Sequence, residues 1–134
     1  MATIETFFDQ TDATLTILVK GVVTIEEINQ TISKQYPLTR CQMVIWDFCE
    51  ADMSQLPTQQ MDSVIKTARQ YSDHRRDAPT IYIGNRPFLY GMLRMYAQKS
   101  GITRQGALLT VFHDWDEANE WLQQRDLTPR QRPQ

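Results

Sequence analysis

The chain opens with two short runs of β-prone residues, after which apolar runs alternate with amphipathic stretches. Residues Ile4–Asp9 and Thr14–Lys20 predict two strands, and Gln10–Ala13 between them predicts the tight turn of an antiparallel hairpin. In the second run the odd positions 15, 17 and 19 are apolar, which predicts that one face of this strand is buried. Gly21 is predicted to end it.

The next segment predicts a helix that begins after Thr24 and continues to about Lys34. Thr24 and Glu27 have the spacing of a capping box, in which each side chain bonds the backbone amide of the other residue. Isoleucines at positions 25, 28 and 32 form one buried stripe, and Pro37 stops the helix.

Met43–Trp46 is an unbroken apolar run that leads into Asp47. Because no polar residue alternates with the apolar ones, this run predicts an interior strand covered on both faces. Pro57 suits the first turn of a following helix. The apolar residues of that helix recur at a spacing of three and four: Met61, Val64, Ile65, Ala68 and Tyr71.

The second half of the chain repeats a strand and a helix twice. Thr80–Ile83 predicts a strand closed by Gly84, and Asn85 is expected to cap the helix that Gly101 ends. The buried stripe of this helix is Phe88, Leu89, Met92, Met95 and Tyr96.

A last strand, Ala107–Phe112, precedes a helix that Asp114 caps and for which Glu117 is expected to complete a second capping box. The residues predicted to face the sheet are Trp115, Ala118, Trp121 and Leu122. The resulting order β-β-α-β-α-β-α-β-α predicts an α/β sandwich with a mostly parallel sheet and an antiparallel first strand. We expect one domain over residues 1–124 and a polar, flexible tail over residues 125–134.

Composition and charge remove several classes of function. The 134 residues carry a net charge of −2, so no overall positive field attracts nucleic acid. No apolar run approaches the roughly 18 residues of a membrane span. The first residues, MATIETFFDQ, lack the basic start and apolar core of a signal peptide. We therefore expect a cytoplasmic protein with no nucleic-acid partner and no membrane span.

Groups that could carry out catalysis are few and scattered. His74 lies in a charged loop, while His113 follows the last predicted strand, as a structural residue or a proton-transfer group. Cys41 and Cys49 flank the Met43–Trp46 strand at a separation of roughly 26 Å, beyond the about 7 Å that a disulfide allows. Neither a nucleophile triad, nor zinc-ligand spacing, nor a glycine-rich phosphate loop is present in the sequence. We therefore expect a non-enzymatic protein without cofactor or metal.

Open α/β sheets tend to bind ligands at the carboxyl ends of their strands, and several polar candidates gather at that edge. Asp47 either contacts a ligand there or stabilises the loop after its strand, and Cys49–Gln55 is the expected loop. Asn85 and Arg86 open a helix, where backbone amides and a cation favour an anion, although capping also explains them. His113 lies at the same edge.

The third predicted helix carries a second candidate surface. Tyr90 and Arg94 lie four residues apart on the side opposite the apolar stripe and are therefore neighbours. Gly91 lies at the margin of that side, in mid-helix, where glycine costs about 1 kcal/mol relative to alanine. Either the face is solvated and the glycine serves packing, or the face binds a partner, for example a second copy of the chain.

Two of these segments and the central strand resemble a known family. Phe88–Tyr96, FLYGMLRMY, is similar to the aromatic–Gly-Met-x-Arg-Met–aromatic helix of the SpoIIAA-like family of STAS/Sec14-type domains, which are related to anti-anti-sigma factors. Val111–Leu122, VFHDWDEANEWL, resembles the closing strand and acidic-capped helix of that family, and Val44–Asp47 resembles its central strand. The resemblance implies a non-enzymatic regulatory domain with an unidentified protein partner. The Sec14 relationship implies the alternative, a carrier with an apolar cavity for a lipid or another small hydrophobic ligand.

One segment departs from the family pattern. Phosphorylatable anti-anti-sigma factors carry an Asp-Ser-Gly-type motif at the start of the second helix, whereas the corresponding Ala51–Pro57, ADMSQLP, has no Ser-Gly pair. Ser54 is therefore either a phosphorylation site or a loop and capping residue. The candidate partner or ligand surface comprises Asp47, Ser54, Asn85, Arg86, Tyr90, Gly91, Arg94 and His113.

Overall fold

The structure is a computed structural model of the chain, and it describes residues 2–37, 43–54, 61–71, 79–103 and 109–133. Its elements are β1 (Thr3–Asp9), β2 (Thr14–Val22), α1 (Ile25–Gln35), β3 (Met43–Asp52), α2 (Met61–Arg69), β4 (Thr80–Ile83), α3 (Pro87–Thr103), β5 (Leu109–Phe112) and α4 (Trp115–Gln124). The predicted order of strands and helices is confirmed. Cys41, Pro57 and His74 lie outside the described residues, as do residues 107 and 108 of the last predicted strand.

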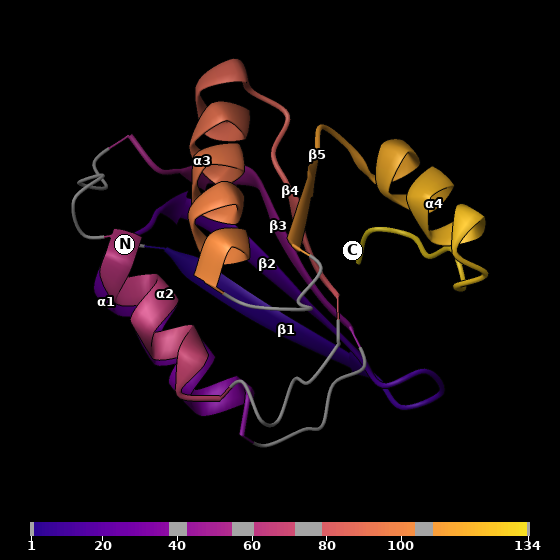
Figure 1. Ribbon diagram of the computed structural model, residues 1–134, viewed down its shortest axis with the longest axis horizontal. Coiled ribbons are helices and arrows are strands. Elements are labelled where there is room, and N and C mark those ends of the chain that lie inside the picture. Colours follow the sequence, from indigo (N-terminus) through magenta and orange to yellow (C-terminus); the bar gives the residue numbers. More distant parts are fainter. Residues whose placement is uncertain (1, 38–42, 55–60, 72–78, 104–108, 134) are drawn as a thin grey trace.

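The described strands form a five-stranded sheet in the order β1-β2-β3-β4-β5. β1 and β2 pair antiparallel, as the hairpin prediction requires, and the remaining neighbours pair parallel. Figure 1 shows α1, α2 and α3 together on one face of the sheet and α4 on the other. Right-handed crossovers between consecutive neighbouring strands place their helices on one face. No described strand follows α4, so the crossover rule does not apply to it.

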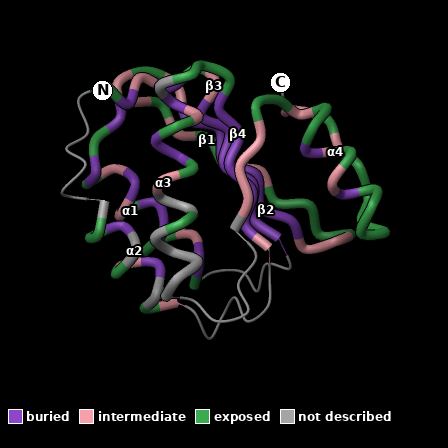
Figure 2. The backbone as a smooth tube through the Cα atoms, turned by 45° about the horizontal axis from the view of Figure 1, so that its top comes forward, coloured by how far each residue is buried: buried purple, intermediate pink, exposed green. Residues whose placement is uncertain are grey.

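The sheet buries apolar side chains on both faces, and Figure 2 shows the buried residues concentrated in its strands. On the face covered by α1 to α3, the aromatic residues Trp46, Phe48 and Tyr82 pack with isoleucines of α1 and leucines of α3. On the other face, Ile45, Ile81 and Ile83 pack against α4 through Ala118 and Leu122. Trp115 and Trp121 pack partly buried against the same cluster, so the predicted inner face of α4 is confirmed.

The predicted buried face of β2, at positions 15, 17 and 19, is confirmed, and the opposite face is buried as well. Thr14, Thr16 and Leu18 retain at most 4% exposure, as little as the apolar residues between them. The alternation of apolar residues with threonine predicted only the first of these faces, and the fold covers the second one too. Gly21 does not end the strand either: β2 continues to Val22, and Gly21 adopts a positive φ of 87° within it.

β3 is longer than predicted and contains an irregularity. Leu18 pairs with Asp47 and Lys20 with Glu50, so two steps along β2 oppose three along β3. This extra residue is a β-bulge, which reverses the alternation of side chains along the strand. Asp47 therefore lies inside the strand rather than at its end. The expected loop Cys49–Gln55 was wrong over residues 49–52, which belong to β3; residue 55 is outside the described part.

The helix ends agree with the predictions at α1 and differ at α3. The Thr24 hydroxyl accepts from the Glu27 amide at 3.2 Å, and a Glu27 carboxylate oxygen accepts from the Thr24 amide at 3.0 Å, so the capping box is confirmed. At α3, the Tyr90 amide donates to the Arg86 carbonyl, which places Arg86 rather than Asn85 at the N-cap position. Gly101 does not end α3, which continues to Thr103. No helix in the described ranges is long and apolar enough to cross a bilayer.

Candidate functional site

Two of the candidate residues are stacked on each other where α3 passes the end of β5. The rings of Tyr90 and His113 lie 3.7 Å apart between centroids and 16° from parallel. The guanidinium carbon of Arg94 lies 5.9 Å from the Tyr90 ring centre, within cation–π range. On the other side, His113 Nδ1 lies 2.9 Å from Glu117 Oε1. Arg94, Tyr90, His113 and Glu117 thus form a row from α3 to α4, here called the Tyr90 cluster.

The first turn of α4 orients the histidine of this cluster. Asp114 caps the helix as predicted, because its carboxylate accepts from the Glu117 amide at 2.9 Å. Glu117 Oε1 accepts from the His113 amide at 2.6 Å and not from that of Asp114, so the second capping box was wrong. Glu117 therefore holds both the backbone and the ring of His113, next to Tyr90.

Gly91 lies beside the Tyr90 cluster on the exposed side of α3. A Cβ atom placed on Gly91 would have no described atom within 4 Å. Pro87, Arg94 and Gln98 are also exposed, and with Gly91 they follow the helical spacing of one face, here called the α3 strip. The described structure therefore offers no packing reason for this glycine.

Ser54, Asn85 and Arg86 lie near the carboxyl ends of β3 and β4. The amide and hydroxyl of Ser54 both donate to Asp52 Oδ1, at 3.0 and 2.5 Å, and these bonds lower the pKa of the Asp52 carboxyl. The Arg86 guanidinium donates to the Ala51 carbonyl and so ties the start of α3 to the end of β3. Asn85 is exposed. The same edge continues into the Tyr90 cluster, because the Tyr90 amide donates to the Arg86 carbonyl at 2.8 Å and the Gly84 amide donates to the carbonyl of Phe112, the residue before His113, at 3.0 Å.

Asp47 is a fully buried carboxylate, with 0% exposure. Its Oδ2 accepts from Trp115 Nε1 at 2.8 Å and from Arg132 Nε at 2.7 Å, while Oδ1 accepts from the Cys49 amide at 2.8 Å. Burial works to raise the pKa of Asp47, but these hydrogen bonds outweigh it and hold the pKa below its ordinary value. Asp47 therefore links β3, α4 and the last residues of the chain.

Cys49, the neighbour of Asp47 in the bulge, is a poor nucleophile. Burial and the adjacent Asp47 charge raise the pKa of its thiol to about 12. A thiol with that pKa stays protonated at neutral pH, and the thiolate is the reactive form. Among the described residues, no group of three or more metal-binding side chains comes together.

Residues 125–133, here called the C-terminal segment, contribute two arginines that sequence analysis missed. Arg132 contacts Asp47 and Glu50. Arg130 contacts Asp12, lies 3.6 Å from Asp9, and exchanges two backbone hydrogen bonds with the Asn119 side chain. The polar residues and prolines of this segment predicted a flexible tail. The pair Arg130 and Arg132 was the one signal in the sequence that could have indicated contact with carboxylates. The domain boundary at 124 and the flexibility of the tail stay predictions.

The comparisons with known proteins concern the fold alone. No family model matches the chain, and neither does any curated protein. One similar structure is an uncharacterised DUF3478-family protein with a SpoIIAA-like fold from Shewanella loihica PV-4: 18% identity, TM-score 0.58, covering 90% of this chain and 93% of that one. Another is the anti-sigma factor antagonist SpoIIAA in its unphosphorylated form: 12% identity, TM-score 0.54, covering 90% and 98%. Both likenesses extend over nearly the whole of each chain.

Proposed function

We propose that this chain, which has the SpoIIAA-like fold, is a non-enzymatic regulatory module that binds another protein through the α3 strip and the Tyr90 cluster. The observation that carries the proposal is Gly91, an exposed mid-helix glycine with empty space above it. One of the similar structures is an anti-sigma factor antagonist, which is consistent with a regulatory role. The cytoplasm is the compartment that we expect for this module.

The glycine has a physical cost that a partner would explain. Glycine inside a helix costs about 1 kcal/mol relative to alanine, and no described side chain packs against Gly91 in return. Without a Cβ, the helix backbone at residue 91 is open to close approach. Tyr90 and Arg94 flank this opening, and tyrosine and arginine are enriched among the residues that dominate binding energy.

The same cluster does not assemble a catalytic set. In the described part of the chain, His113 contacts Tyr90 and Glu117, and it forms no hydrogen bond with a serine, threonine or cysteine. Cys49 is kept protonated. A nucleophile activated by an adjacent base is therefore not supported by the described geometry.

Site-specific cross-linking tests the proposal in cells that express the chain naturally. A photoreactive phenylalanine analogue at Gln98, an exposed position of the α3 strip that leaves Gly91 intact, should give a discrete protein adduct, and the same analogue at Glu26, exposed on α1, should not. Adding Arg94→Glu should reduce the adduct at least tenfold by removing the cation of the strip. An adduct of twice the 15.7 kDa chain mass identifies a second copy, and any other discrete mass a different partner. Equal labelling at positions 98 and 26, or no adduct at either, would contradict the proposal.

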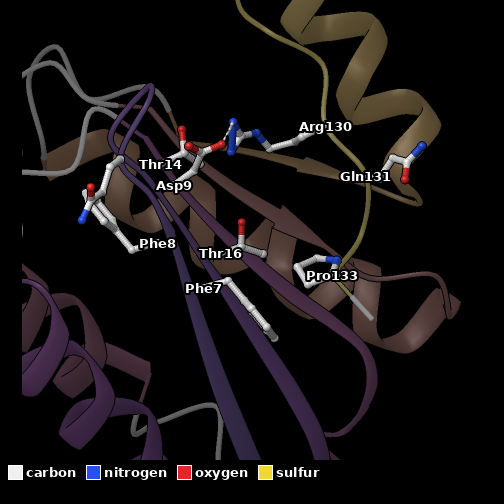
Figure 3. Close-up of a pocket in the computed structure, with 9 residues that line it drawn as sticks. Phe7, Phe8, Asp9, Thr14, Thr16, Arg130, Gln131 and Pro133 are labelled. Atoms are coloured by element: carbon white, nitrogen blue, oxygen red, sulfur yellow. Dashed lines mark ion pairs between the residues drawn. The ribbon is translucent and has the colours of Figure 1, made fainter.

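A carrier of small molecules is the second candidate, and a groove favours it. The groove has a volume of about 600 Å³, within the usual range of ligand sites. It lies between the β1–β2 hairpin and the C-terminal segment, and Figure 3 shows Phe7, Thr16 and Pro133 around it. Because its walls combine aromatic rings with Asp9 and Arg130, it suits an amphipathic ligand better than a wholly apolar one. A reproducible added mass in native mass spectrometry would support this candidate, and only bare protein would count against it.

A further inference from the structure

Four carboxylates lie along the face of the sheet opposite α3. Asp9 and Asp12 come from the β1–β2 hairpin, and Asp47 and Glu50 come from β3. Together they are called the acidic seat, and the C-terminal segment occupies it with Arg130 and Arg132. Figure 3 shows Arg130 directed toward Asp9 over the floor of the groove.

The seat matches a pair of arginines separated by one residue. Arg132 reaches Asp47 and Glu50 together because the bulge in β3 brings these two carboxylates to one side of the strand. Arg130 reaches the two hairpin carboxylates. The side chains of residues 130 and 132 thus each form ion pairs with two carboxylates, and no carboxylate is shared between them.

The C-terminal segment does not fill the seat completely. The groove of about 600 Å³ remains open beside it, between the hairpin and residues 130–133. Arg130 Nε and Asp12 Oδ1 are buried without a hydrogen-bond partner among the described atoms. A segment held by charge with little apolar burial opens more easily than the core of the fold. Another segment with the same arginines and an apolar side chain for the groove would fit the seat better.

We propose that the acidic seat is a docking site for an extended segment of a partner protein that contains Arg-x-Arg, and that the C-terminal segment is a built-in competitor for it. Charge complementarity carries the choice of partner, since the chain's own Arg130-Gln131-Arg132 is already bound there. This site lies on the other face of the sheet and is independent of the α3 strip.

The test uses the full-length chain with Arg130→Gln and Arg132→Gln, and a synthetic peptide of residues 128–134. The Trp115 indole proton reports on the seat in NMR spectra, because Trp115 Nε1 donates to Asp47 Oδ2. The Trp46 indole is the matched control, since it donates at 3.2 Å to the Tyr36 hydroxyl within the α1–α3 core. The double variant should shift the Trp115 signal and leave that of Trp46 in place.

Peptide titration then separates the outcomes. The peptide should return the Trp115 signal of the double variant toward its wild-type position, with an affinity at least tenfold higher than for the wild-type chain. A peptide with glutamine at both arginine positions should have no effect. An unresponsive Trp115 signal in a folded variant overturns the docking site, and equal affinity for both chains overturns the competition.

A second measurement covers the case in which the double variant does not fold. In the wild-type chain, raising the salt from about 0.05 to about 0.5 M shortens the screening length. It weakens the ion pairs to Asp9 and Glu50, whose side chains are half exposed, more than the pair to the buried Asp47. Exchange of the Arg130 amide, which donates to Asn119 Oδ1 at 2.9 Å, should then accelerate at least threefold, while exchange in β3 stays unchanged. Exchange of the Arg130 amide that is insensitive to salt would overturn the proposal.

Discussion

Gly84 and Gly91 lie close together in the chain, but their surroundings differ. A Cβ on Gly84 would lie 2.8 Å from Leu89 Cγ and from Leu93 Cδ1, whereas one on Gly91 would meet nothing within 4 Å in the described structure. Gly84 is thus required by the packing of α3 against the end of β4. Sequence analysis recognised Gly84 only as a strand end, because a lone glycine does not reveal what approaches it.

This contrast predicts opposite effects of the same substitution. Gly84→Ala should lower the free energy of unfolding by about 1–3 kcal/mol, because it overpacks the contact with Leu89 and Leu93. Gly91→Ala should raise it by up to about 1 kcal/mol through helix propensity. Urea denaturation of both variants and the wild type measures the two changes. A loss of stability in Gly91→Ala would show that residue 91 is packed after all.

At the scale of elements, features that depend on neighbouring residues were predictable from the sequence, whereas the register between strands was not. The Thr24–Glu27 capping box and the Asp114 cap were predictable because both partners lie within one helical turn. The β3 bulge was not, because a bulge depends on how two strands pair. Simple alternation would have placed Asp47 and Glu50 on opposite faces of β3, and no residue of the strand signals otherwise.

The caps give an element-scale prediction. Thr24→Ala and Asp114→Ala should each lower the free energy of unfolding by about 1 kcal/mol, since each leaves a helix amide without its acceptor. Ser33→Ala, at an exposed position inside α1, is the control and should change it by less than about 0.5 kcal/mol. Chemical denaturation measures all three. Asp114→Ala should also broaden the NMR signals of His113, whose backbone Glu117 holds from the same turn.

At the scale of the whole molecule, Asp47 joins parts of the chain that are far apart in sequence. Its carboxylate binds Trp115 of α4 and Arg132 of the C-terminal segment. Because the pKa of Asp47 is lowered in the folded chain, its ionised form stabilises the fold. That contribution is present above the unfolded pKa, near 3.8, and is lost as the pH falls through the folded value.

Asp47→Asn tests this linkage. The variant should be about 1–3 kcal/mol less stable at pH 7, because Arg132 loses one of its two charged partners and keeps only Glu50. Between about pH 5 and pH 2 its stability should fall less steeply than that of the wild type. Asp9 and Asp52, whose lowered pKa values have other causes, remain in both chains, so the difference in slope reports on Asp47 together with Glu50, with which it shares Arg132. Parallel pH profiles would contradict this account of Asp47.

The sequence by itself determined the order of the elements, the antiparallel hairpin, the first capping box and the inner face of α4. These features depend on residues close together in the chain, where hydrophobic period and cap chemistry act directly. They also support the SpoIIAA-like architecture to which the similar structures point.

Only the tertiary structure decided where the polar residues meet. The burial of Asp47, the stacking of Tyr90 on His113, and the seat of Arg130 and Arg132 each join residues from different elements. The covering of both faces of β2 is of the same kind. The physical reason is that such contacts depend on strand register, on the β3 bulge and on which face a helix covers, and none of these is a property of neighbouring residues alone.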